Sequence, residues 1–261
     1  MTITPYCFIR YLTIIICGVE TLEISMNIMG TPSSIHPSLI WDHDTVILLD
    51  AGYPGQLPQI REAIERAGVS FVKLNKVIIT HHDLDHIGSL SSILKELPER
   101  VEVLAHEEEK PYIQAEKRPT KLTQIEAQLN SLPEEGGQEI KTFYEYLKAN
   151  YENLKARVDQ TVSDEEELPY CGGITVIHTP GHTPGHICLY HKQSKTLITG
   201  DAMLVEGGLL VPAPPFTNHD TGSAIKSLKK LTRYDIETVI CYHGGLYKDN
   251  PNRRIAELAN G

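Results

Sequence analysis

The stretch VIITHHDLDHIGS, from Val77 to Ser89, decides the fold, because an apolar β-branched run leads directly into a loop crowded with histidine and aspartate. In a tight loop after a strand, side chains at positions i, i+2, i+4 and i+5 can converge on a small volume. Those side chains here are His81, Asp83, Asp85 and His86. Zinc and other first-row divalent ions bind imidazole nitrogen and carboxylate oxygen. The loop alone also fits a polar turn in which an aspartate caps the helical pattern that begins at Ile87.

Residues of the same kind recur after other apolar runs, which favours a metal centre over a polar turn. HTPGHTPGH (178–186) spaces three histidines four residues apart, and its prolines and glycines predict tight turns. Asp201 follows the run TLITG, and His243 follows the run TVICY. Functional side chains often gather in loops at strand ends that a rigid sheet positions.

Short apolar runs alternate with helical patterns along most of the chain. Strands are predicted within 45–52, 76–83, 174–182, 196–203 and 238–245, and helices within 57–68, 87–98 and 224–233. This alternation indicates an α/β protein.

The stretch from about 107 to 167 interrupts the alternation, with dense charge and no strand-like run. Within 138–158, apolar residues fall on one face at helical spacing. They are Ile140, Phe143, Tyr144, Leu147, Leu154 and Val158. We predict a single domain over 1–261 that carries this helical insertion. A cap over a substrate site and a packed surface or homodimer contact explain the insertion equally well.

Composition limits the partners and the compartment. The net charge of −10 disfavours a nucleic-acid partner. The five cysteines are scattered without a CxxC pair, which indicates reduced thiols in a cytoplasmic protein. The apolar run near the N-terminus, 11–19, is too short for a transmembrane helix and lacks a cleavage site typical of a signal peptide, so we expect no membrane association.

Five motifs in order, LLDAG, THHDLDH, TPGHT, TGD and YHGG, resemble the signature motifs of the metallo-β-lactamase-fold hydrolases. The resemblance spans roughly 45–245. It implies a four-layer αββα sandwich of two mixed β-sheets covered by helices, with metal ions at the edge of the sandwich.

Carried over position by position, the resemblance implies seven metal ligands. One ion would be bound by His81, Asp83 and His182, and a second by Asp85, His86 and His243, with Asp201 bridging both. Asp50 would support the metal loops structurally. His178 and His186 have no ligand role in the family, so we interpret them as residues that support the ligands or belong to the core, and His82 as a spacer.

Asp83 departs from the family pattern, in which the loop reads His-x-His-x-Asp-His. A carboxylate is a harder ligand than imidazole, so manganese or iron becomes plausible beside zinc. Flavodiiron proteins of the same fold carry a glutamate at this position, so a carboxylate is compatible with a dinuclear site. We therefore expect two divalent metal ions, with zinc as the first choice.

The resemblance implies hydrolysis of a small molecule by a metal-bound hydroxide, with Asp85 relaying the proton. A lactonase of the homoserine-lactone type is favoured. A glyoxalase-II-like thioesterase, a di-iron redox enzyme of the same fold and a binding module with a lapsed site are the alternatives. Tyr53, Tyr112, Tyr242 and Phe216 are candidate substrate contacts, although core packing explains Tyr242 equally well.

Overall fold

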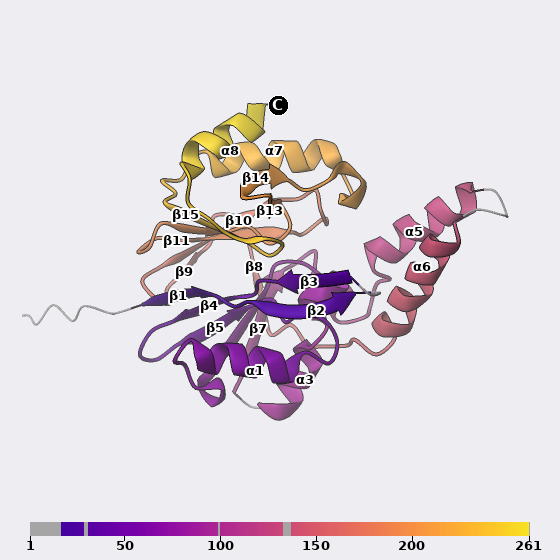
Figure 1. Ribbon diagram of the computed structural model, residues 1–261. Coiled ribbons are helices and arrows are strands. Elements are labelled where there is room, and N and C mark those ends of the chain that lie inside the picture. Colours follow the sequence, from indigo (N-terminus) through magenta and orange to yellow (C-terminus); the bar gives the residue numbers. More distant parts are fainter. Residues whose placement is uncertain (1–16, 29–30, 99, 133–136, 261) are drawn as a thin grey trace, which may run out of the picture.

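Two six-stranded sheets lie face to face, and helices cover their outer faces (Figure 1). The computed structural model describes residues 17–28, 31–98, 100–132 and 137–260, so the N-terminal run considered above lies largely outside the described residues. The first sheet has the order β1 (Gly18–Thr21), β4 (Ser38–Trp41), β5 (Val46–Leu49), β6 (Lys76–Ile79), β7 (Glu102–His106), β8 (Gln160–Val162). The second has the order β16 (Gly245–Tyr247), β15 (Thr238–Cys241), β12 (Thr196–Ile198), β11 (Ile187–His191), β10 (Ile174–His178), β9 (Glu167–Leu168).

Both sheets are mixed. Strands β5 to β8 run parallel, whereas β1, β4 and β5 pair antiparallel. In the second sheet only the β12–β15 pair is parallel. Two hairpins are separate from these sheets: β2 (Ile24–Ile28) with β3 (Thr31–Ile35), and β13 (Met203–Glu206) with β14 (Leu209–Pro212). The predicted αββα sandwich of two mixed sheets is confirmed.

The apolar strands bury both faces because successive side chains point to opposite sides of a sheet. Ile47, Leu49 and Ile78 point into the layer between the two sheets, where they meet residues such as Val176 of the second sheet. Leu48 points the other way, toward the helices. This two-sided burial explains why the strands are continuous apolar runs rather than alternating ones.

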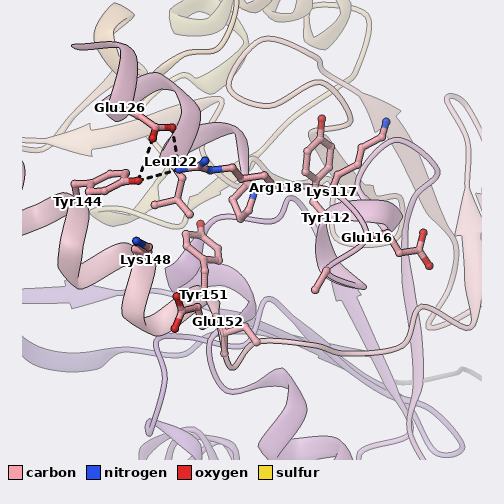
Figure 2. Close-up of a pocket in the computed structure, with 13 residues that line it drawn as sticks. Tyr112, Glu116, Lys117, Arg118, Leu122, Glu126, Tyr144, Lys148, Tyr151 and Glu152 are labelled. Atoms are coloured by element: carbon pink, nitrogen blue, oxygen red, sulfur yellow. Dashed lines mark hydrogen bonds and ion pairs between the residues drawn. The ribbon is translucent and has the colours of Figure 1, made fainter. Parts of the chain in front are cut away.

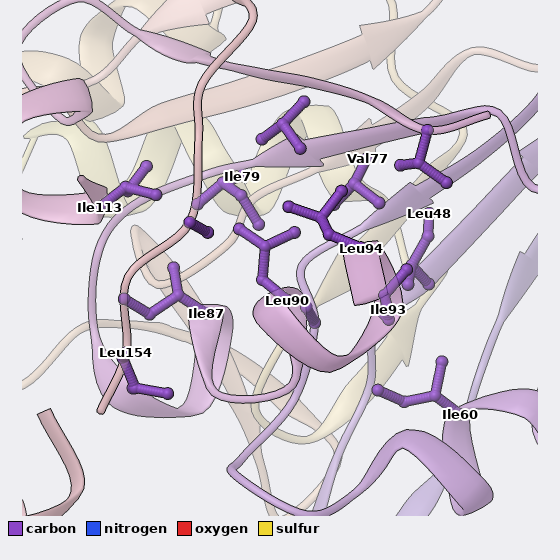
Figure 3. Packing of buried hydrophobic residues seen from close by; sticks show 14 of the residues in the cluster. Leu48, Ile60, Val77, Ile79, Ile87, Leu90, Ile93, Leu94, Ile113 and Leu154 are labelled. Carbon is purple, nitrogen blue, oxygen red and sulfur yellow. The ribbon is translucent and has the colours of Figure 1, made fainter. Parts of the chain in front are cut away.

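Amphipathic helices complete the two outer layers. The first sheet is covered by α1 (Leu57–Arg66) and α3 (Leu90–Glu96), whose apolar side chains pack against those of β5 and β6 (Figure 3). The second sheet is covered by α7 (Thr221–Leu231) and α8 (Pro251–Asn260). Helices were predicted at 57–68, 87–98 and 224–233, close to where α1, α3 and α7 lie.

The stretch predicted as a helical insertion contains α4 (Lys110–Ile113), α5 (Thr120–Ser131) and α6 (Gln138–Tyr151). Helices α5 and α6 form a hairpin that projects from the side of the sandwich (Figure 1). Two expectations about this stretch were wrong. Helix α6 ends at Tyr151, so Leu154 and Val158 do not belong to its face. Strand β8 lies inside the supposedly strand-free stretch, because its three residues are too short to give a visible pattern.

Four strands, two from each sheet, end at candidate site residues. Asp50 follows β5 and His81 follows soon after β6, while Asp201 and His243 follow β12 and β15. The short helix α2 (Leu84–Ile87) carries Asp85 and His86. Among the helices described, none has both the length and the apolar character needed to cross a membrane.

Candidate metal centre

Two clusters of metal-binding side chains lie at the edge of the sandwich. One contains His81, His182 and Asp201, and the other contains Asp85, His86 and His243, with the ligand atoms of each cluster within 4.8 Å of one another. The second cluster combines residues up to 158 positions apart, from Asp85 to His243, because the loops after β6, β10, β12 and β15 meet here.

Asp201 lies between the two clusters. Its Oδ2 is 3.4 Å from His182 Nε2 and 3.4 Å from His243 Nε2, while Oδ1 is 3.3 Å from His86 Nε2. One carboxylate therefore faces histidines of both clusters, which is the placement that a bridging ligand requires.

Asp83 and Asp85 lie at opposite ends of this arrangement. Asp83 Oδ2 is 3.2 Å from His182 Nε2 and 3.7 Å from His81 Nε2, so Asp83 faces the first cluster. Asp85 Oδ2 is 3.2 Å from His243 Nε2 and 3.6 Å from His86 Nε2. The structure thus places all seven candidate ligands at one edge of the sandwich, with Asp83 and Asp201 both close to His182.

The site favours positive charge. Burial by itself would lower the pKa of His243, but Asp201 and Asp85 raise it to about 10. Burial would likewise raise the pKa of Asp201, yet His243 and His86 hold it well below its ordinary value. Three largely inaccessible aspartates in one site need compensating cations, since an unpaired buried charge is costly.

The donor atoms fit divalent cations. His81 Nε2, His86 Nε2 and Asp201 Oδ1 are buried and have no hydrogen-bond partner. Such atoms are rare in folded proteins, and a bound ion is one of the few explanations. A set of imidazole nitrogens and carboxylate oxygens suits zinc, and the three carboxylates also suit manganese or iron.

Asp50 sits behind the ligands and orients one of them. It is buried, accepts hydrogen bonds from the backbone N and Oγ1 of Thr80 at 2.8 Å each, and lies 2.9 Å from His86 Nδ1. A carboxylate at Nδ1 leaves Nε2 directed at the cluster. Asp50 also has a φ of 64°, in the left-handed region that aspartate tolerates better than most residues.

His186 and His178 differ in their distance from the cluster. His186 Nδ1 lies 2.8 Å from Thr179 Oγ1, and its Nε2 accepts a hydrogen bond from the backbone N of Asp201 at 3.1 Å. His186 therefore positions the bridging candidate. His178 instead stacks on His106, with ring centroids 4.0 Å apart, away from the ligand atoms.

Because residue 200 is glycine, the ring of His186 can lie within hydrogen-bond distance of the backbone N of Asp201. The φ of Gly200 is 48°, and a Cβ there would lie 2.8 Å from His186 Nε2 and 3.0 Å from Thr80 Oγ1. Any larger residue would combine backbone strain with a clash beside the candidate ligand.

Glu109 is a buried residue of the site that sequence reasoning missed. Its side chain is fully inaccessible, and its two oxygens contact the loop 81–86 and the loop 182–186. Burial would raise its pKa, but His82 lowers it to about 2. Glu109 lies in the run HEEEK, which looks like an ordinary charged surface, so no signal in a single sequence would have singled it out.

The four candidate substrate contacts are placed very differently. Tyr53 is half-buried and borders a cavity of about 240 Å³ beside helix α6. Tyr242 is buried, donates a hydrogen bond to the backbone carbonyl of Asp85, and packs its ring on His86. Tyr112 stacks on His82, and the side chain of Phe216 is 87% exposed. Of these four, Tyr53 and Tyr112 each border a cavity, and Tyr242 and Phe216 line neither of the two.

A second cavity, of about 420 Å³, lies between α4 and the α5–α6 hairpin (Figure 2). Tyr112 and Tyr151 line it and contact His82. The ring of His82 forms hydrogen bonds with Glu109 and Thr120 rather than with the candidate ligands. In Figure 2, Arg118 points to Glu126 and Tyr144, at 2.9 Å from each. The part of the loop 81–86 that carries His82 therefore separates this cavity from the candidate ligands.

Sequence reasoning also missed three residues that the insertion brings to the site. Lys121 of α5 lies 3.6 Å from Asp83, and Phe143 and Tyr146 of α6 line the same cavity as Tyr53. The strand-end motifs in the sequence could not reveal them, because they come from helices far from those motifs in the chain.

Known proteins resemble this chain over most of its length. The family model of the metallo-beta-lactamase superfamily matches residues 30–243. The "Probable metallo-hydrolase YflN" of Bacillus subtilis is 29% identical over 232 residues, which cover 82% of this chain and 81% of that protein. The hydroxyacylglutathione hydrolase GloC of Haemophilus influenzae is 26% identical over 211 residues, covering 79% of this chain and 84% of that protein.

Solved structures agree with the fold. A metallo-beta-lactamase family protein from Thermus thermophilus superposes with a TM-score of 0.70 at 20% identity, covering 93% of this chain and 78% of that one. A metallo-beta-lactamase superfamily protein from Sulfolobus tokodaii gives a TM-score of 0.62 at 20% identity, covering 93% and 85%. These structures bear out the fold, and the family model together with the relatives shows that the chain is a hydrolytic enzyme that belongs to the metallo-beta-lactamase superfamily.

Proposed function

We propose that this enzyme hydrolyses an acyl bond, in a thioester, ester or lactone, of a small molecule, with two divalent cations at the centre. The observation that carries the proposal is the position of Asp201 between two clusters of ligand atoms. His81, Asp83 and His182 would hold one cation, and Asp85, His86 and His243 the other. When bound, the cations would lower the pKa of a coordinated water and withdraw electron density from the substrate carbonyl.

Asp85 is our candidate for the proton acceptor. Its side chain is 14% exposed, compared with 9% for Asp83 and 11% for Asp201, so it is the most accessible of the three carboxylates. Burial would raise its pKa, but His86 and His243 lower it, which keeps the carboxylate ionised.

The buried residues behind the ligands hold them in place for this reaction. Asp50 fixes His86, and His186 fixes the backbone of Asp201. Ligands whose orientation is set in advance need no rearrangement when the substrate arrives.

Among acyl bonds we favour the thioester. Relatives at 26% and 25% identity are named hydroxyacylglutathione hydrolases, and each match covers more than three quarters of this chain. The lactone that the motifs alone favoured is the second candidate, because the same centre can attack any activated carbonyl.

A panel of thioesters, lactones and phosphodiesters tests the proposal, with protein loaded separately with zinc, manganese or iron. We expect hydrolysis of thioesters or lactones and none of phosphodiesters. Metal-loaded protein that hydrolyses no acyl substrate would overturn the proposal. Metal analysis of protein purified without added zinc separates it from the redox alternative, which requires stoichiometric iron and a visible absorption band.

A further inference from the structure

We infer that the substrate carries a carboxylate on the Asp83 side of the scissile bond, where Lys121 binds it, and an apolar group on the Asp85 side. This inference rests on the proposed function and narrows its substrate class. Two independent features of the structure carry it, one at each end of the candidate metal centre.

Lys121 lies at the first end. Its Nζ is 3.6 Å from Asp83 Oδ2 and donates a hydrogen bond to the carbonyl of Thr217 at 3.0 Å. Across the described parts of the chain, it is the only lysine or arginine that forms an ion pair with a candidate ligand. Its side chain is 21% exposed, so the ammonium group borders the site and is still reachable from solvent.

The surroundings of Lys121 leave it able to bind an anion. An ammonium group has three donors, of which one is used by Thr217 and one faces Asp83. If Asp83 also binds a metal cation, its negative charge is divided between that cation and Lys121. The ammonium group of Lys121 is then only partly neutralised. A substrate carboxylate supplies the remaining counter-charge through a charge-assisted hydrogen bond.

The ammonium group is also held in position. Gln124, one turn further along α5, donates to the carbonyl of Asn218 at 3.2 Å. Together with the Lys121–Thr217 bond, this contact fastens α5 to the segment 217–218. A donor whose position is fixed before binding loses less conformational entropy on binding.

The second end carries the apolar cavity of about 240 Å³. Met26, Tyr53, Pro54, Phe143 and Tyr146 form most of its wall. Phe143 is 39% exposed and Tyr146 is 43% exposed, which is unusual for large aromatic side chains that lie close together. An apolar substrate group would cover them.

This cavity adjoins the Asp85 end of the centre. Helix α2, which carries Asp85, contacts α6, which carries Phe143 and Tyr146. Burial and the negative charge of Asp85 both raise the pKa of Tyr53 and of Tyr146, as expected for phenols near that carboxylate. The insertion thus supplies the cationic end from α5 and part of the apolar end from α6.

Matched thioesters test both ends on zinc-loaded enzyme. The acidic probes are the mono-S-phenyl thioester of adipic acid and S-hexanoyl thioglycolate, which place the carboxylate on opposite sides of the scissile bond. Each is compared with its primary-amide counterpart. For at least one pair, we expect kcat/KM to be about tenfold or more higher for the acid than for the amide, which corresponds to one strong charge-assisted contact.

Variants assign the effect to residues. Lys121→Met should raise KM for the acidic probe and bring its kcat/KM to the level of the amide, and Lys121→Arg should restore part of the preference. Phe143→Ala should lower kcat/KM for acid and amide by the same factor. Lys117→Met removes an exposed lysine of the same insertion and should leave the acid-to-amide ratio unchanged.

A binding measurement separates this inference from the proposed function. Adipate titrated calorimetrically into zinc-loaded enzyme should bind more weakly to Lys121→Met than to the wild type, at equal zinc content. If no thioester, ester or lactone is hydrolysed but adipate binding depends on Lys121, the proposed function fails and the anion site stands. Equal kcat/KM for acids and amides in the wild type, or adipate binding that is indifferent to Lys121, would overturn the inference.

Discussion

Glu109 and His82 face each other in the buried layer beneath the candidate metal centre. One carboxylate oxygen, Oε2, accepts hydrogen bonds from the backbone N of His82, at 2.9 Å, and from its ring Nδ1. The other oxygen accepts from Thr183 Oγ1 at 2.7 Å and from the backbone N of Gly185 at 2.8 Å. Glu109 therefore joins two loops that carry ligands and come from different sheets.

Removing this link should loosen both loops. We expect Glu109→Ala to lower the free energy of unfolding by about 3–5 kcal/mol, because it leaves buried donors unpaired. Zinc content should fall as well, since His82 is flanked by His81 and Asp83. Urea titration and atomic emission measure the two effects. Glu108→Ala, at an exposed neighbouring position, is the control, and an equal loss in both variants would contradict the role of Glu109.

The same carboxylate predicts a pH dependence of stability. The pKa of Glu109 is lowered from 4.5 to about 2, so its ionised form stabilises the folded state above pH 4.5, and this contribution is lost as the pH falls through the folded-state value. In metal-free protein, the stability difference between wild type and Glu109→Gln should shrink by about 3 kcal/mol between pH 5 and pH 2. Urea titrations at several pH values measure it, and a difference that does not change with pH would refute the prediction.

Gly200 and Gly207 form a matched pair that separates backbone strain from crowding. Both have positive φ, 48° and 56°, but a Cβ at Gly207 meets nothing within 4 Å, whereas one at Gly200 meets His186 and Thr80. Gly207→Ala should cost about 1–2 kcal/mol of stability and keep full activity. Gly200→Ala should cost more and also lose metal and activity. Equal behaviour of the two variants in thermal melts and assays would show that crowding beside Asp201 is unimportant.

His182 and His178 offer a similar comparison within one motif. His182 Nε2 faces Asp83 and Asp201, whereas the ring of His178 stacks on His106. We expect His182→Ala to reduce bound metal and to reduce kcat/KM by about a hundredfold or more. Replacing a residue that only supports a metal ligand typically costs about 10- to 100-fold, so a direct ligand should cost at least as much. His178→Ala should retain metal. Full activity of His182→Ala would remove it from the ligand set.

The variant Asp83→His tests whether residue 83 determines which metal the centre prefers. The replacement restores the usual imidazole of the family, a ligand that suits zinc better than manganese. After dialysis against equimolar zinc and manganese, the variant should hold a larger zinc-to-manganese ratio than the wild type, by about tenfold. Asp83→Asn keeps the side-chain shape without the charge and serves as the control. An unchanged ratio would place the metal preference elsewhere in the centre.

The strand-end patterns predicted the α/β class and brought candidate ligands to strand ends, while the family resemblance supplied the four-layer sandwich and the division of the seven candidate ligands. Each ligand follows an apolar run, such as Val77–Ile79 before His81, and parallel strands bring their carboxyl ends to one edge. Periodicity and turn residues are local signals, so they are visible in a single sequence.

The supporting residues were not predictable in this way. Glu109 and Lys121 act through contacts with residues distant in the chain, and nothing in their neighbours marks them as buried or as part of a site. Tyr242 was open to two interpretations, because alternation along a strand end does not show which side faces the cluster. Its hydrogen bond to the Asp85 carbonyl places it in the packing beneath the ligands.

The order of the ligands along the chain has a consequence for biosynthesis. His81, Asp83, Asp85 and His86 leave the ribosome first, and His182, Asp201 and His243 follow only with the second sheet. Until Asp201 has been translated, no carboxylate lies between the two halves to bridge them. If these residues bind metal as proposed, a nascent chain offers only part of the ligand set, and full occupancy requires that both halves have been made and have packed together.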